Sequence, residues 1–210
     1  STVLVAGLRW DGTGPACAVA RACADAGHAA ALTLAQLRDS EITWAPPEMW
    51  VVENPSILAM ALRRFGTRCP PLVCTSGWPN SAVLRTLRRA ADLGTRLHHH
   101  GDFDGDGLRI VAHVADRTGA RPWRMGTGDY LDGLRTDVPS PAPGRVTDAP
   151  WDADLAPAIR SHDRVVAEEQ VATRLLDDLA EAAPPGDRTD AGARPWAVPS
   201  RPLATPWIDM

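Results

Sequence analysis

The chain has 210 residues, of which 44% are hydrophobic and 23% charged, the balance of an ordinary globular protein. Its formal net charge of −4 excludes a general electrostatic attraction to nucleic acid, so any such contact requires a local basic patch or a metal ion. No apolar run approaches the roughly 18 residues of a membrane span, and no secretory signal pattern is present. We therefore expect a cytoplasmic protein without membrane contacts. Because a strand-like segment follows Ser1 at once, we also expect a piece of a longer protein.

Apolar, β-branched runs alternate along the chain with segments of helical periodicity, and glycine or proline marks most of the boundaries. The apolar runs predict strands over residues 2–8, 49–54, 71–77, 95–102 and 121–125. The periodic segments predict helices over residues 16–26, 55–65, 80–93, 107–119 and 129–134, and residues 30–37 predict a short strand followed by a turn of helix.

This alternation, with short connections, predicts an α/β fold over residues 1–135, with a mostly parallel sheet and helices on both faces. Ligand sites in such sheets lie at the carboxyl ends of the strands. Residues 136–162 are rich in proline and predict a linker. An apolar stripe over residues 163–183 predicts a C-terminal helix that packs on the domain. Residues 184–210, where proline and glycine are frequent, predict a flexible tail.

The four cysteines are Cys17, Cys23, Cys69 and Cys74, and their spacings fit no zinc-ribbon pattern. All four lie in apolar surroundings, which favours reduced, buried thiols.

The stretch HHHGDFDGDG, residues 98–107, admits several interpretations. Neighbouring histidines on a strand point to opposite faces, so at most His98 and His100 could share a zinc ion, and packing within the strand is favoured. The aspartates also fill early positions of an EF-hand loop, but its twelfth position is His113, where a bidentate glutamate is required. The segment before the aspartates is strand-like, whereas an EF-hand begins with a helix.

A magnesium site fits this stretch better. Asp102 and Asp104 follow the carboxyl end of a predicted strand, and their spacing predicts that both carboxylates lie on one side. The glycines beside them, Gly101, Gly105 and Gly107, leave room for a phosphate and a hydrated ion. Hard carboxylate ligands suit Mg²⁺, or Mn²⁺ in its place.

A third carboxylate, Glu53, ends the predicted strand MWVVEN. A glutamate there is costly to bury unless it is paired or binds a metal. If this strand lies beside the strand that precedes Asp102, the three carboxylates converge. A solvated turn glutamate is the alternative.

The order of these parts, VVENPS, CTSG and then GDFDGDG, resembles the Toprim domain. The closer resemblance is to the Toprim-like C-terminal domain of a family of large bacterial proteins, related to the Toprim domains of the Wadjet plasmid-defence nuclease subunit JetD and of the topoisomerase VI A subunit. It rests on the segments VENPSILAMA, CPPLVCTSGWPNSAVLRTLRR, HHHGDFDGDGLRIVAHV and PWRMGTGDYL, in this order.

The resemblance implies that Glu53, Asp102 and Asp104 bind the metal and catalyse, and that Glu168, or Glu169 beside it in VVAEEQV, contributes a further ligand. An exposed helix face is the alternative for Glu168. Topoisomerase relatives cut DNA with a tyrosine on a separate domain. The only tyrosine here is Tyr130, which lies in no DNA-binding motif, so hydrolysis by a metal-activated water is expected instead.

Several residues are candidates for supporting roles. Ser76 and Gly77 follow a predicted strand and could hold a phosphate, Arg109 could neutralise charge in the transition state or pair with Asp106, and Gly107 lies at the start of the predicted helix. The arginines Arg63, Arg64, Arg85, Arg88 and Arg89 fit a nucleic-acid track or a solvated helix face, and the second is favoured.

The sequence thus predicts a Mg²⁺-dependent DNA nuclease acting in defence against foreign DNA, with DNA and further domains or complex subunits as partners. The alternative is a Toprim-like module without catalysis that binds nucleic acid or serves assembly. A response-regulator-like phosphotransfer domain ranks lower, because it requires a lysine at a strand end and the chain contains no lysine.

Overall fold

The computed structural model describes residues 1–136 and 139–183. The strands are β1 (Thr2–Ala6), β2 (Asp11–Thr13), β3 (Ala30–Thr33), β4 (Glu41–Trp44), β5 (Glu48–Val52), β6 (Leu72–Cys74), β7 (Arg96–His99) and β8 (Arg121–Pro122). The helices are α1 (Pro15–Asp25), α2 (Leu34–Arg38), α3 (Pro55–Phe65), α4 (Ser81–Asp92), α5 (Gly105–Thr118), α6 (Thr127–Gly133), α7 (Leu155–His162) and α8 (Glu168–Ala182), with a 3₁₀ turn at Gly66–Arg68. The predicted α/β class is confirmed.

The main sheet has six strands in the order β3-β1-β6-β5-β7-β8. Strand β5 runs parallel to both β6 and β7, and β7 runs parallel to β8, whereas β1 is antiparallel to its two neighbours. The sheet is therefore mixed and mostly parallel. Strands β2 and β4 form a separate antiparallel ribbon, which the sequence did not predict because neither contains an apolar run.

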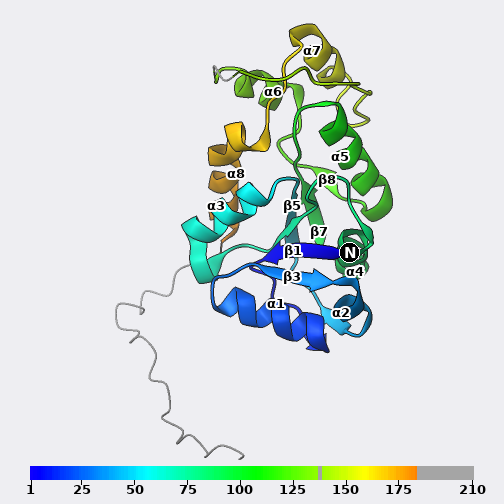
Figure 1. Ribbon diagram of the computed structural model, residues 1–210, viewed down its shortest axis with the longest axis vertical. Coiled ribbons are helices and arrows are strands. Elements are labelled where there is room, and N and C mark those ends of the chain that lie inside the picture. The colour runs from blue at the N-terminus through cyan, green and yellow to red at the C-terminus, as the bar shows by residue number, and fades with distance from the viewer. Residues whose placement is uncertain (137–138, 184–210) are drawn as a thin grey trace, which may run out of the picture.

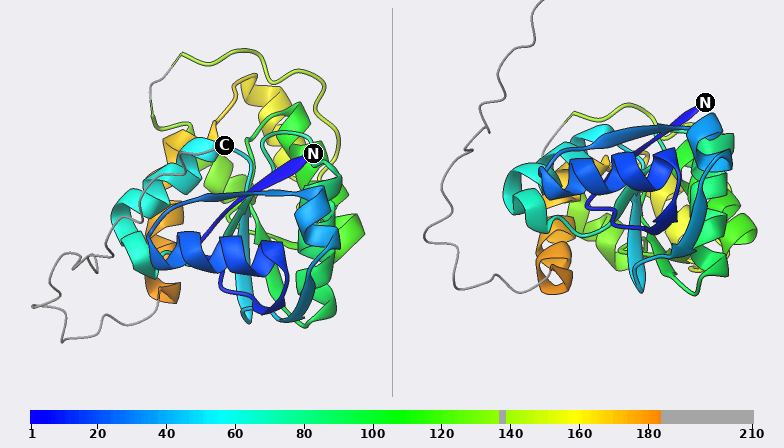
Figure 2. Two further views of the ribbon diagram at one scale, coloured as in Figure 1. Left: turned by 60° about the horizontal axis from the view of Figure 1, so that its bottom comes forward. Right: turned by 90° about the horizontal axis from the view of Figure 1, so that it is seen from below.

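Helices cover both faces of the sheet, as predicted (Figure 1). On one face, α1 and α4 pack on inward-pointing residues such as Val5 and Val51. Figure 2 shows α1 crossing this face. On the other face, α3 and α8 pack on residues such as Trp50 and Leu72. The strands alternate between the two faces, so each contributes to two apolar layers.

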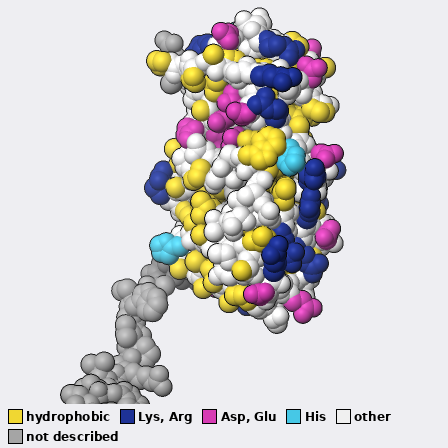
Figure 3. Space-filling view, turned by 45° about the vertical axis from the view of Figure 1, so that its right-hand side comes forward, with side chains coloured by type: hydrophobic (Ala, Val, Ile, Leu, Met, Phe, Trp, Pro, Cys, Tyr) yellow, Lys and Arg dark blue, Asp and Glu magenta, His cyan; other side chains and the backbone are white. Residues whose placement is uncertain are grey.

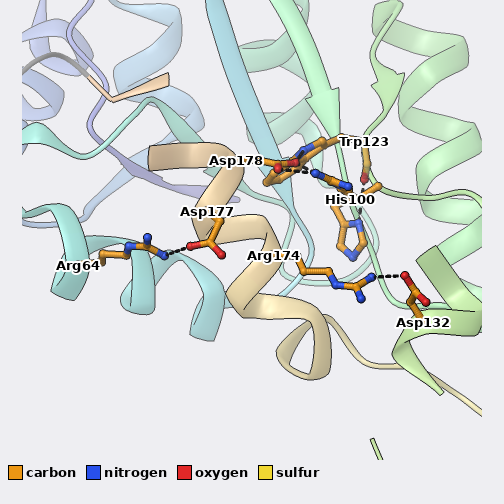
Figure 4. Close-up of polar contacts among 8 residues, drawn as sticks. Arg64, His100, Trp123, Asp132, Arg174, Asp177 and Asp178 are labelled. Atoms are coloured by element: carbon orange, nitrogen blue, oxygen red, sulfur yellow. Dashed lines mark hydrogen bonds and ion pairs between the residues drawn. The ribbon is translucent and has the colours of Figure 1, made fainter. Parts of the chain in front are cut away.

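Helix α8 is fixed to the rest of the fold by polar contacts along its length (Figure 4). Asp177 pairs with Arg64 of α3 at 2.8 Å, and Arg174 pairs with Asp132 of α6 at 2.8 Å. Asp178 accepts a hydrogen bond from the indole N–H of Trp123 at 2.9 Å. These contacts, together with its buried apolar stripe, hold the first residue of α8, Glu168, against the carboxyl ends of the strands.

Some boundaries differ from the prediction. Strand β6 ends at Cys74, because Ser76 and Gly77 have φ angles of 53° and 81°, which an extended strand does not allow. The C-terminal helix begins at Glu168 rather than near residue 163, because Val166 is extended and pairs with Phe103.

The range 136–162, expected to be a linker, contains α7. The predicted tail, residues 184–210, lies outside the described residues. Within the ranges that the structure describes, no helix is both long and apolar enough to cross a membrane.

Candidate functional site

The carboxyl ends of β5, β6 and β7 meet at one edge of the sheet, because these three neighbours are parallel. In the register, Trp50 lies opposite His98 and Val51 opposite His99, so Glu53 after β5 lies near the loop that follows β7. The condition set by the sequence, that these two strands be neighbours, is met. The helices α3, α4 and α5 begin at this same edge (Figure 1).

Three acidic residues at this edge are connected in a closed ring of hydrogen bonds. Oε2 of Glu53 accepts the backbone N–H of Asp102 at 3.3 Å, and Oδ1 of Asp102 accepts the backbone N–H of Glu168 at 2.8 Å. Oε1 of Glu168 in turn accepts the backbone N–H of Glu53 at 2.9 Å. We call Glu53, Asp102 and Glu168 the carboxylate ring. It connects three segments that lie far apart in the sequence.

Glu168 is the most deeply buried member, with an exposed fraction of 0%. Its second oxygen, Oε2, accepts the backbone N–H of Asn54 at 2.6 Å. Asn54 is the N-cap of α3, so Glu168 places a carboxylate at the start of this helix, where negative charge is favourable. The next residue, Glu169, accepts a hydrogen bond from the hydroxyl of Ser56 at 2.7 Å. The start of α8 is thereby joined to the start of α3.

No cationic side chain among the described residues compensates the carboxylates of the ring. Among the described residues, no arginine or histidine nitrogen lies within 4.0 Å of a carboxylate oxygen of Glu53, Asp102 or Glu168. Burial, and then the charge of Asp102, raises the pKa of Glu53 to about 7. Burial also raises the pKa of Asp102, and it raises the pKa of Glu168 well above its ordinary value.

Asp104 lies beside the carboxylate ring but is oriented differently from the prediction. Strand β7 ends at His99, so Asp102 and Asp104 belong to a loop and the alternation of a strand does not apply to them. Asp104 is the N-cap of α5, and its Oδ1 accepts the backbone N–H groups of Asp106 and Gly107 at 2.9 and 2.7 Å. Its charge nevertheless raises the pKa of both Glu53 and Asp102.

Arg109 pairs with Asp106, one of the two alternatives that the sequence left open, and also donates to the carbonyl oxygen of Arg145. Its contacts among the described residues therefore lie outside the carboxylate ring.

The glycines of this stretch make room for the protein itself. A Cβ atom on Gly107 would lie 2.1 Å from the carbonyl oxygen of Asp102, and one on Gly105 would lie 2.2 Å from that of Arg145. A Cβ on Gly101 would meet Oε2 of Glu53 at 3.0 Å. The space that was expected to admit a phosphate is therefore filled by the backbone of the site, and the glycines let the loop fold closely over the start of α5.

The histidines that precede the aspartates are packing residues. His99 and His100 are fully buried, and burial lowers the pKa of His99 to about 3 and that of His100 to about 4. Nδ1 of His100 lies 2.8 Å from the carbonyl oxygen of Trp123 (Figure 4). The His98 ring stacks on Trp50 at 5.4 Å. In the part of the chain that is described, no group of three or more His, Cys, Asp or Glu side chains stands ready to hold a metal ion.

The comparison with known protein families covers the segment that contains this site. Residues 30–179 match the family described as "Protein of unknown function C-terminus (DUF2399)". The chain belongs to this family. The range that matches the DUF2399 C-terminal domain runs from β3 into α8 and includes all members of the carboxylate ring. A search of curated proteins found no match to the chain.

The loop after β6 brings further residues to the same edge of this DUF2399 domain. Its Ser76 and Gly77 adopt left-handed φ angles, and the hydroxyl of Ser76 lies 3.4 Å from the thiol of Cys74, whose Sγ contacts the carbonyl oxygen of Glu53 at 3.3 Å. The four cysteines are free thiols, and three of them, Cys74 included, are buried.

Trp78, in the same loop, is a residue that the sequence analysis missed. Its side chain is 56% exposed, and its ring lies 5.2 Å from the ring of His113 on α5. Figure 3 shows hydrophobic and histidine side chains beside a group of acidic ones on this face of the domain. An exposed tryptophan held against a helix offers a flat surface to a ligand. The eight tryptophans of the chain gave no signal to distinguish this one, because exposure depends on the fold.

The site offers the ligand type that a hard divalent cation prefers, although its carboxylates are not gathered into a group of three among the described residues. Each of Glu53, Asp102 and Asp104 uses one carboxylate oxygen for a backbone hydrogen bond, and the described contacts leave its other oxygen without a partner. Carboxylate oxygens are the ligands that Mg²⁺ and Mn²⁺ prefer. Glu168 differs, because each of its oxygens already accepts a backbone N–H.

Proposed function

We propose that this DUF2399 domain is a Mg²⁺-dependent nuclease that hydrolyses phosphodiester bonds of DNA, acting in defence against foreign DNA. The observation that carries the proposal is the uncompensated carboxylate ring at the carboxyl ends of two adjacent parallel strands. Burial and the charges of neighbouring carboxylates raise the pKa of Glu53 and of Asp102, and such a site favours a divalent cation because the cation removes that repulsion.

The order of the acidic residues and their strands along the chain supports a Toprim-like nuclease. A glutamate follows one parallel strand, and an Asp-x-Asp pair follows the neighbouring strand. This is the arrangement expected from the resemblance to Toprim domains and to the JetD nuclease subunit. Tyr130 supports hydrolysis over attack by tyrosine, since it is fully buried and donates its hydroxyl to the carbonyl oxygen of Arg164 at 2.8 Å.

In the proposed site Glu53, Asp102 and Asp104 would hold Mg²⁺ or Mn²⁺ through their remaining oxygens. Bound there, the ion would lower the pKa of a water molecule and neutralise charge on the phosphate. Glu168, expected as a further ligand, is proposed as a positioning residue, since it holds the backbone of Glu53 and is itself bound to Asp102. Asp104 also orients α5, whose N-terminus favours an anion.

Neighbouring residues suit DNA as the substrate. Trp78 is exposed and fixed against His113, and aromatic faces stack on bases irrespective of sequence. Ser76 and the backbone of Gly77 lie in the same loop, at the edge where the phosphate would approach.

A second function, a Toprim-like module without catalysis that binds nucleic acid or serves assembly, is favoured by one observation. Each carboxylate of the ring accepts a backbone N–H with at least one oxygen, so the ring also serves to join α8 to the sheet. Such a domain would use Glu168 and Asp102 to hold its shape, and it would bind its partners without cleaving them.

A plasmid-cleavage assay separates the two functions. With Mg²⁺ or Mn²⁺ present, we expect the wild type to nick supercoiled plasmid, and we expect Asp102→Asn and Glu53→Gln to lower the rate at least tenfold. Each amide keeps one oxygen to accept its backbone hydrogen bond, so the fold should persist. Asp116→Asn, an exposed carboxylate of α5 that pairs with Arg117, is the matched control and should cleave like the wild type. Equal rates in all four proteins, or no cleavage by the folded wild type, would rule out the nuclease and favour the module.

A further inference from the structure

A pocket of about 600 Å³ lies between α2, β4 and α4, away from the carboxylate ring. Its volume is within the range of small-molecule sites. The lining includes Arg85, Arg88 and Arg89 of α4, which the spacing of a helix places on one face. Figure 3 shows basic side chains gathered low on that face of the molecule, in the region where Figure 1 places α2 and α4.

Within the described part of the chain, the three arginines of the pocket have no acidic partner within 4.0 Å. Over residues 1–136 and 139–183, the ion pairs within 4.0 Å involve other arginines, such as Arg64, Arg96 and Arg124. Arg85 and Arg89 instead donate to the carbonyl oxygens of Leu37 and Ile42. Arg88 donates to the carbonyl oxygen of Arg117 over a long distance of 3.4 Å.

These carbonyl contacts orient the guanidinium groups without neutralising them. Three oriented guanidinium groups are a good match for the oxygens of a phosphate.

The other side chains that line the pocket are polar, apolar and acidic. Thr86 is fully buried in the wall of the pocket, and within the described residues its hydroxyl has no hydrogen-bond partner. Leu37, Ile42 and Leu84 supply an apolar wall, while Glu41 and Asp92 are exposed carboxylates at its margin. An apolar wall between cations and carboxylates suits a ligand with a phosphate at one end and hydroxyl or amino groups at the other.

We propose that this pocket binds the phosphate ester of a nucleotide, with Arg85, Arg88 and Arg89 around the phosphate. The nucleotide is either free or part of a nucleic-acid strand. The site is separate from the proposed nuclease centre and does not depend on it, because its residues come from α4 and from the segment that runs from α2 to β4. The sequence favoured a solvated helix face for these arginines of α4. Under this proposal, the same face is a binding surface.

Calorimetric titration in EDTA tests the proposal without any metal-dependent contribution. The full chain is titrated with ADP and, separately, with a six-nucleotide single-stranded DNA. We expect saturable binding of at least one probe, weakened at least tenfold by Arg88→Gln and unchanged by Arg63→Gln, an exposed arginine of α3 on the other face of the sheet. Thermal unfolding shows whether Arg88→Gln keeps the fold. If it does not, Arg85→Gln is the second variant that tests the same site.

Each outcome of the titration either identifies the ligand or overturns the proposal. Binding of ADP identifies a free nucleotide as the ligand, and binding of the oligonucleotide alone identifies a strand. The proposal is overturned if neither probe binds, or if both arginine variants bind like the wild type. Because the titration contains no divalent cation, a failure of the proposed nuclease would leave this result standing.

Discussion

Replacing Glu168 by alanine is expected to lower the free energy of unfolding by about 3 kcal/mol, because two backbone donors lose their acceptor and the fully buried side chain leaves a cavity. The donors are the N–H groups of Glu53 and Asn54, at 2.9 and 2.6 Å from the carboxylate oxygens of Glu168. Since Glu168 also donates its own N–H to Asp102, a disturbance at this position reaches the whole carboxylate ring. Urea denaturation of the two proteins at one pH measures the difference.

The matched control for this prediction is the neighbouring residue. Glu169 lies one position further along α8 and accepts a hydrogen bond from the side chain of Ser56 rather than from a backbone group. Because that contact is exposed, Glu169→Ala should cost less than about 1 kcal/mol. If both substitutions have equally small effects, the carboxylate ring does not hold α8 to the sheet.

The ionisation of Glu53 should make the metal-free protein less stable as the pH rises from about 5 to 8. The pKa of Glu53 is about 7 in the folded protein, against 4.5 for the ordinary group. The folded state therefore binds more protons than the unfolded chain between these values, and its stability falls as the pH passes through the window. At about 1.4 kcal/mol per pH unit, the loss should be about 2 to 3 kcal/mol.

Two buried histidines change the free energy of unfolding with pH in the opposite direction over part of this range. The pKa values of His99 and His100 lie at about 3 and about 4, below the ordinary 6.5, so their contribution to stability rises with pH up to about 6.5. The informative quantity is therefore the stability of the wild type minus that of Glu53→Gln, followed by urea denaturation from pH 5 to 8. A difference that stays flat with pH would contradict a raised pKa at Glu53. Mg²⁺ added at pH 8 should restore stability to the wild type only.

Much of the architecture could be predicted from local signals. The apolar runs and the glycine and proline boundaries identified the strands and helices that build the site, because those patterns depend on burial and on backbone conformation alone. The parallel direction of β5 and β7 followed from the α/β alternation, whereas their adjacency, and with it the approach of Glu53 to Asp102, was a condition that only the structure could settle.

The directions of the carboxylates could not be predicted. Asp104 caps α5 because its loop leaves the strand earlier than the apolar pattern implied. The two hydrogen bonds that Glu168 accepts depend on the docking of α8, which brings together residues 115 and 114 positions apart in the chain. The glycines were interpreted as room for a ligand, whereas Gly107 admits the carbonyl oxygen of Asp102, a contact that only the tertiary structure defines.

The central claim is that Glu53 and Asp102 together hold a divalent cation. The most direct test is a calorimetric titration of the full chain with Mn²⁺ at pH 8, above the pKa of about 7 that burial gives Glu53. The account predicts saturable binding to the wild type, at least tenfold weaker binding to Glu53→Gln and to Asp102→Asn, and wild-type binding to Asp116→Asn. Absence of binding to the folded wild type, or equal binding to all four proteins, would contradict it.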